Sequence, residues 1–158
     1  MKDITSTELD GHVGKHISEI CGCSFTNDGN NHCAHFVCHV MEYNFGLTCF
    51  GMSGKGERSK SANIRVHEVF PQCRRVGKWT DKTLDILKGF IFVTQASNVN
   101  LTKKVISNVP KKHIGIFIEQ NVWQYKNRVR HVVKQTPAEF KQHYAGKGFE
   151  IYYGEFPL

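Results

Sequence analysis

The feature that most constrains the fold of this chain is a change in hydrophobic period part-way along it. Between residues 5 and 44 the apolar side chains recur three and four residues apart, whereas from residue 89 they alternate with a period of two. Helical spacing followed by strand spacing is typical of an α+β fold. We therefore expect N-terminal helices packed on an antiparallel β-sheet that the second half of the chain forms.

The helices are expected in three places in the first half. Thr5 and Glu8 have the spacing of a capping box, and the apolar residues after them predict a helix that continues to residue 20. A second helical pattern covers about residues 32–44, and a short one covers residues 62–70. The Gly- and Ser-rich residues between these last two patterns are expected to form a loop.

The strands are expected in the second half, with one more helix between the last two. Thr136, Pro137 and Glu139 are typical of a helix start. The expected strands cover residues 89–96, 113–120, 121–127, 128–133 and 149–155. The alternation places His113 and Ile114 on opposite faces of their strand.

Length and charge limit the class of protein. The chain has 158 residues, which predicts a single domain over residues 1–158. No apolar run approaches the roughly 18 residues that a membrane span needs, and the polar start does not resemble a secretory signal, so we expect a cytoplasmic product without membrane insertion. Eight basic residues against one acidic residue between 99 and 135 predict a cationic surface for an anionic partner.

One cysteine and one histidine lie where a cysteine hydrolase needs them. A Cys at the first turn of a helix is activated, because the unpaired amides and the helix dipole stabilise the thiolate, and Cys33 has that place. The same amides can hold the oxyanion that forms during attack on a carbonyl. His113 opens a predicted strand and is the expected base. Gln124, or alternatively Asn127, could orient the imidazole ring of that base from the next strand.

These segments resemble those of a known superfamily. The run Asn31-His32-Cys33-Ala34-His35-Phe36-Val37 resembles the nucleophile segment of NlpC-type and CHAP-type cell-wall amidases, and His113-Ile114-Gly115-Ile116-Phe117 resembles their histidine strand. The pattern from Val122 to Phe140 is most similar to the amidase effectors of type VI secretion. The resemblance covers about residues 28–145. Many members have His as the third residue, where this chain has Gln124.

The resemblance implies a papain-like fold and a function. It implies hydrolysis of an amide bond in peptidoglycan stem peptides, without metal or cofactor, either between D-Glu and the diamino acid or at the crosslink to D-Ala. It also implies an antibacterial effector that acts in the periplasm of a target cell, and a cognate immunity protein. His32 and Trp123 are expected at the rim of the substrate groove, and Lys111, Lys112 and Arg128 are expected to meet substrate carboxylates.

Three other interpretations compete with this one. His35, Cys38 and His39 are of zinc-ligand type, but no second cluster follows at finger or ribbon spacing, so we expect packed or solvated side chains and no metal. The basic and aromatic residues around Trp123 would suit a nucleic-acid-binding module, although no nucleic-acid motif accompanies them. The same Cys and His could also serve a papain-like acyltransferase.

Overall fold

The computed structural model describes residues 2–157, which form an α+β fold with an antiparallel sheet. The chain divides into two compact units. The sheet unit comprises Val66–Val122 and the residues from Gln135 onward, and the helical unit comprises Lys2–Arg65 and Trp123–Lys134. Over the described residues, no helix is long and apolar enough to cross a membrane.

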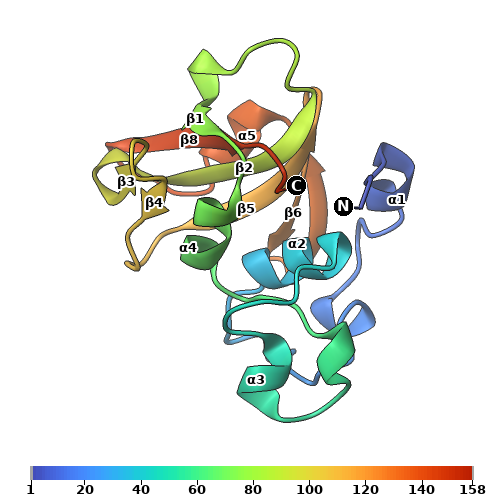
Figure 1. Cartoon of the computed structure of the whole chain (residues 1–158). Helices are drawn as coiled ribbons and strands as arrows, with labels where there is room; N and C mark the ends of the chain where they lie inside the picture. Colours follow the sequence, from blue (N-terminus) through green and yellow to red (C-terminus); the bar gives the residue numbers. More distant parts are fainter. Residues whose placement is uncertain (1, 158) are drawn as a thin grey trace. The chain divides into compact units, whose positions relative to one another are not determined.

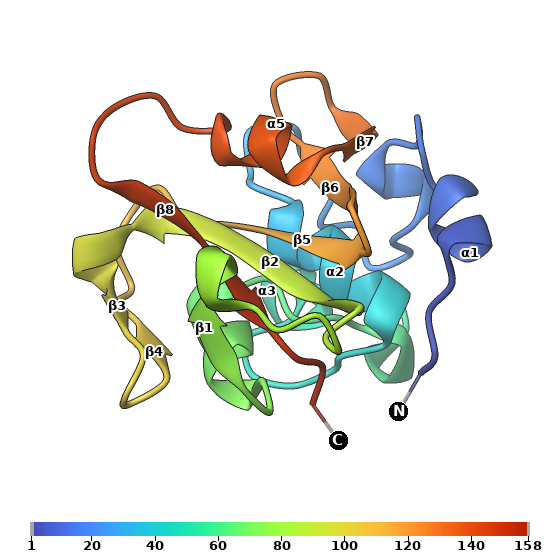
Figure 2. The ribbon, with the colours of Figure 1, turned by 90° about the horizontal axis from the view of Figure 1, so that it is seen from above.

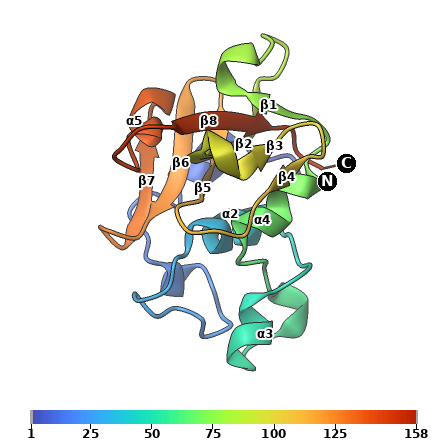
Figure 3. The ribbon, with the colours of Figure 1, turned by 90° about the vertical axis from the view of Figure 1, so that its left-hand side faces the viewer.

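The sheet unit is built on four antiparallel strands in the order β1-β8-β2-β5 (Figures 1 and 2). Its strands are β1 (Val76–Lys78), β2 (Lys88–Gln95), β5 (His113–Ile118) and β8 (Phe149–Gly154), with the small separate ribbon of β3 (Val99–Asn100) and β4 (Val105–Ile106) visible in Figure 3. Its helices are α4 (Val66–Val69) and α5 (Pro137–Lys141), and its 3₁₀ turns are η3 (Phe70–Gln72), η4 (Trp79–Asp81) and η5 (Ala96–Asn98). The predicted strands at 89–96, 113–120 and 149–155 and the predicted helix start at Thr136 are confirmed.

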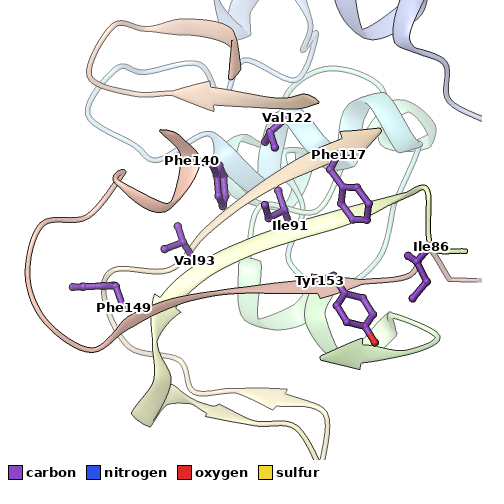
Figure 4. Close-up of a cluster of buried hydrophobic side chains, with 8 residues drawn as sticks. All are labelled: Ile86, Ile91, Val93, Phe117, Val122, Phe140, Phe149 and Tyr153. Carbon is purple, nitrogen blue, oxygen red and sulfur yellow. The ribbon is translucent and has the colours of Figure 1, made fainter. Parts of the chain in front are cut away.

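Alternation along β2 and β5 gives this sheet two apolar faces. Phe92 pairs with Ile114 in the register, and Val93 pairs with His113, so that neighbouring pairs point to opposite sides. One face carries a cluster with α5 above it, as Figure 4 shows; its members are Ile86, Ile91, Val93, Phe117, Val122, Phe140, Phe149 and Tyr153. His113 therefore faces the α5 side of the sheet.

A buried carboxylate joins the end of the chain to the start of β1. Glu155 Oε1 accepts hydrogen bonds of 2.9 Å from both Arg74 Nη2 and Arg75 Nη2, and Arg75 Nε donates to Oε2. The guanidinium groups of Arg75 and Arg74 hold the pKa of the Glu155 carboxyl below its usual range. The ion pair therefore stabilises the fold above the unfolded pKa, and this contribution is lost as the pH falls through the lower folded pKa.

The Glu155→Gln variant is expected to lose about 1–2 kcal/mol of unfolding free energy at neutral pH, because both arginines keep half their surface in water. The difference from wild type should shrink as the pH falls below the unfolded value of about 4.3, and it should disappear below the lower folded pKa, where the wild-type carboxyl is also neutral. Urea denaturation of both proteins, at neutral pH and at an acid pH below the folded pKa of Glu155, measures the two differences. An equal loss at both would mean that the charge of Glu155 does not contribute.

The helical unit contains the N-terminal half and two short strands. Its elements are α1 (Ser6–Asp10), η1 (Ile17–Glu19), α2 (Cys33–Met41), α3 (Cys49–Ser53) and η2 (Arg58–Lys60), together with β6 (Asn121–Lys126) from Trp123 onward and β7 (His131–Gln135) up to Lys134. The apolar face of α2 is buried. The helix ends at Glu42, which adopts the left-handed conformation with φ 60°, close to the end predicted at about residue 44.

The prediction of a long first helix that continues to residue 20 is wrong. Thr5 caps α1 as expected, with its hydroxyl oxygen accepting from the Glu8 amide at 3.2 Å, but the helix ends after Asp10. The chain instead turns at Gly14, where φ is +85°, and the Gly14 amide donates to the carbonyl of Val132 at 2.9 Å. The Val132 amide returns a bond of 3.0 Å to Lys15. Pairing with β7 thus takes precedence over helical propensity.

Candidate functional site

The expected nucleophile is the first residue of α2. Cys33 is buried, and its backbone amide donates to the side-chain oxygen of Asn31 at 3.0 Å. The following amides, of Ala34 and His35, lie in the first helical turn, where helix geometry supplies no internal acceptor. Because α2 has nine residues, its amides and dipole can act together on an anion at this end.

Asn127 braces the segment that leads into α2. Its side-chain oxygen accepts from the His32 amide at 3.0 Å, and its side-chain nitrogen donates to the carbonyl of Asn30 at 2.5 Å. Both ends of the amide group are thereby engaged by the loop just before Cys33. Asn127 therefore fixes the loop that precedes Cys33, whereas the sequence left open a ring-orienting role for it.

The Asn127→Ala variant is expected to lose about 1–3 kcal/mol of unfolding free energy, because the His32 amide loses its acceptor where water has little access. Urea denaturation measures the loss. Asn121→Ala, which changes an exposed residue at the start of β6, serves as the control and should stay within about 0.5 kcal/mol of wild type. Equal effects of the two substitutions would contradict the bracing role.

His113 is the first residue of β5, in the sheet unit, and is held there by aromatic neighbours. Its ring stacks on that of His143 with centroids 3.7 Å apart and an angle of 5° between the planes, and the Phe140 ring lies 5.5 Å away. Tyr144 completes the group, since its hydroxyl donates to the carbonyl of Lys112 at 3.1 Å. The imidazole therefore has a fixed orientation within its own unit.

The other predicted site residues are divided between the two units. Gln124 and Trp123 are buried on β6 in the helical unit, and the indole nitrogen of Trp123 donates to Asp10 at 3.1 Å. His32 is also buried, and both its ring nitrogens have partners. Both side chains are thus buried, and their place at the rim of a substrate groove stays a prediction.

The three basic side chains expected to meet substrate differ in their surroundings. Arg128, in the helical unit, and Lys111, in the sheet unit, are exposed, and Lys111 adopts a positive φ of 64°. Lys112 is half-buried, and its ammonium donates to the carbonyl of Val109. Their contact with substrate carboxylates stays a prediction.

A second constellation lies wholly within the helical unit. The ligand atoms of Cys21, His35, His39 and Cys49 all lie within 4.8 Å of one another. The Cys21 thiol first, and then the rings of His35 and His39 and the Ser61 hydroxyl, hold the pKa of the Cys49 thiol below its usual range. All six cysteines lie within the described residues, and each is a buried residue outside any disulfide.

Sequence reasoning missed this constellation although it noticed two of its members. His35 and His39 are one helical turn apart, which is a signal for a shared face. Cys21 and Cys49 are distant in sequence from that helix and from each other, and they do not have the close pair spacing of zinc fingers. The signal that could have found them is only the presence of buried cysteines on both sides of a His-x-x-x-His helix.

A scan against protein-family models and searches of curated proteins and of solved structures find no match to this chain.

Proposed function

We propose that this protein is a papain-like cysteine amidase that hydrolyses an amide bond in peptidoglycan stem peptides. The observation that carries the proposal is the position of Cys33 as the first residue of α2, with its preceding loop fixed by Asn31 and Asn127. This is where a thiolate and an oxyanion are both stabilised by helix amides. The resemblance of the segments around Cys33 and His113 to cell-wall amidases supports the choice of substrate.

In the proposed reaction His113 accepts the proton of the Cys33 thiol, and the sulfur attacks the carbonyl carbon of the scissile amide. The negative oxygen of the tetrahedral intermediate is held by the first-turn amides of α2. His113 then donates the proton to the leaving amine as the C–N bond breaks. Water, deprotonated by His113, attacks the thioester, and release of the acid regenerates the Cys33 thiol. Gln124 is assigned the role of orienting the imidazole.

The substrate and setting follow from the same proposal. The bond is either the one between D-Glu and the diamino acid or the crosslink to D-Ala, and Lys111, Lys112 and Arg128 would meet the carboxylates of the wall polymer. The protein would act as an antibacterial effector in the periplasm of a target cell, and the producing cell would need an immunity protein that blocks the site.

Digestion of purified sacculi tests the function. We expect wild-type protein to release fragments with new stem-peptide termini, which mass spectrometry of the muropeptides assigns to one bond, and the Cys33→Ala variant to release none. A new amino terminus on the diamino acid identifies the first bond, and conversion of crosslinked dimers to monomers identifies the second.

Two results would contradict the amidase proposal and would each support one of the alternative functions. Transfer of an acyl group from a thioester on Cys33, without wall fragments, would identify an acyltransferase. Salt-dependent retention on DNA or RNA that the Cys33→Ala variant keeps, again without fragments, would identify a nucleic-acid-binding module.

A further inference from the structure

The four side chains of the Cys21, His35, His39 and Cys49 constellation come from three separate segments. Cys21 follows η1, the two histidines lie one turn apart on α2, and Cys49 is the first residue of α3. We propose that these four residues form a zinc(II) site, in which two thiolates and two imidazoles complete a tetrahedron. This site is independent of the proposed amidase centre, because it does not use Cys33 or His113.

The spacing of the donor atoms suits zinc. With Zn–S bonds of about 2.3 Å and Zn–N bonds of about 2.0–2.1 Å at tetrahedral angles, a sulfur and a nitrogen on one ion lie about 3.5 Å apart. The Sγ atom of Cys49 and the Nε2 atom of His39 are 3.6 Å apart. The remaining ligand atoms fall within the 4.8 Å limit of the group, so that a small closure of the four side chains would bring them to zinc.

The hydrogen bonds around His35 leave one nitrogen for a metal. His32 Nε2 lies 2.7 Å from the carbonyl of Asn27, which can only accept, so this nitrogen carries the proton. In the neutral ring that a fully buried site favours, His32 Nδ1 then accepts from His35 Nδ1 across 3.0 Å. The lone pair of His35 is therefore on Nε2.

That Nε2 atom is the strongest sign of a missing partner. His35 has an exposed fraction of 0%, and within residues 2–157 its Nε2 has no hydrogen-bond partner. A buried acceptor without a partner is costly, and coordination to a cation removes that cost. The chain from the Asn27 carbonyl through His32 is the kind of outer-shell support that fixes the tautomer and direction of a metal-binding histidine.

Both sulfur atoms also accept hydrogen bonds from backbone amides. The Cys23 amide donates to Cys21 Sγ at 3.2 Å, and the Ala62 amide donates to Cys49 Sγ at 3.4 Å. The Ser61 hydroxyl lies 3.3 Å from Cys49 Sγ and is itself held by the Phe50 amide. Donors fixed on the backbone stabilise negative sulfur, and thiolate with imidazole is the ligand set that selects zinc over magnesium or calcium.

The ion has a route to the site. An open pocket of about 580 Å³ in the helical unit is lined in part by His39, Cys23 and Ser61, and also by the acidic side chains of Glu42 and Glu57. His39 is the only half-buried ligand of the four described, so the cluster opens on this side. Lys60 also lines the pocket, and its ammonium lies 3.2 Å from the Glu57 carboxylate, so Glu42 is the side chain at this pocket that would attract a cation.

The proposed ion is structural rather than catalytic. Four protein ligands leave no coordination position for water or substrate. The segment between α2 and residue 65 contains only α3, of five residues, and the three-residue turn η2, so its own hydrogen bonds give it little stability. Zinc would attach this segment and the Cys21 turn to α2.

Metal analysis of the full-length, untagged chain tests the site. We expect purified wild-type protein to carry one zinc ion per chain, and Cys49→Ala and His39→Gln to carry at least about tenfold less. Cobalt(II) in place of zinc should give thiolate charge-transfer bands and tetrahedral visible bands, which both substitutions remove. Cys38→Ala is the matched control, because Cys38 is a buried cysteine on α2, the helix that carries His35 and His39, but lies outside the cluster. This variant should keep the zinc.

The supporting shell gives a second measurement that does not depend on loss of a ligand. His32→Phe should still bind zinc but with an affinity roughly 10–100-fold lower in chelator competition, since His35 loses its partner. Wild-type protein without zinc after purification and zinc titration would overturn the proposal. A Cys21–Cys49 disulfide in fresh wild-type protein, found as a mass lower by two hydrogens, would also overturn it and would identify a redox pair.

Discussion

The Cys33→Ala and His113→Gln variants are each expected to lower the rate of stem-peptide hydrolysis by at least about 10³-fold, and the double variant is expected to be no slower than the singles. Residues that act as one catalytic unit show this lack of additivity, because removing either partner already abolishes the shared step. The rate of fragment release from sacculi, followed by mass spectrometry, measures all three proteins.

Cys73→Ala provides the matched control for these rates. Burial raises the pKa of the Cys73 thiol to about 12, so this sulfur stays protonated at neutral pH and has no nucleophilic role. The variant should therefore keep the wild-type rate. If the double variant were slower than wild type by the product of the two single losses, Cys33 and His113 would act independently and the catalytic pair would be excluded.

Removal of zinc is expected to lower the melting temperature by about 10 °C. A ligand that binds only the folded state at about 1,000 times its Kd contributes about 4 kcal/mol, and each kcal/mol shifts the melting temperature of a chain of 158 residues by roughly 2–4 °C. Thermal unfolding with and without a chelator, followed by circular dichroism, measures the shift. Zinc should restore the wild-type value, whereas magnesium should not.

The Cys49→Ala variant separates this effect from general effects of the chelator. It should melt at the temperature of the zinc-free wild type and should not respond to the chelator. An unchanged wild-type melting temperature after complete loss of zinc would show that the ion contributes nothing to folding. The amidase proposal would remain unaffected by that result, because it is tested by the rates of the Cys33 and His113 variants.

The elements that sequence reasoning predicted correctly are those with local causes. The capping box of Thr136 and Glu139 starts α5 through bonds three residues apart, and the alternation of β2 and β5 reflects burial of both faces of one sheet. The first helix was wrong because its end is decided by Val132, more than a hundred residues away in sequence. A propensity pattern contains no information about such a partner.

In the candidate site, too, the features that could be predicted from the sequence are those with local causes. Cys33 could be placed at a helix start because the turn residues before it and the apolar period after it are adjacent in sequence. The bracing role of Asn127 depends on backbone groups about 95 residues away, and the grouping of Cys21 with Cys49 depends on how two irregular segments fold against α2. These are tertiary facts, which residue spacing alone does not reveal.

The pairing of the N-terminal segment with β7 has a consequence for any shortened form of the protein. Residues 14 and 15 engage both backbone groups of Val132. A chain that begins after them would leave a strand with an open amide and an open carbonyl, in a stretch that contains the adjacent valines Val132 and Val133. Strands of that kind recruit strands from neighbouring molecules, so truncation here favours self-association of the shortened chains.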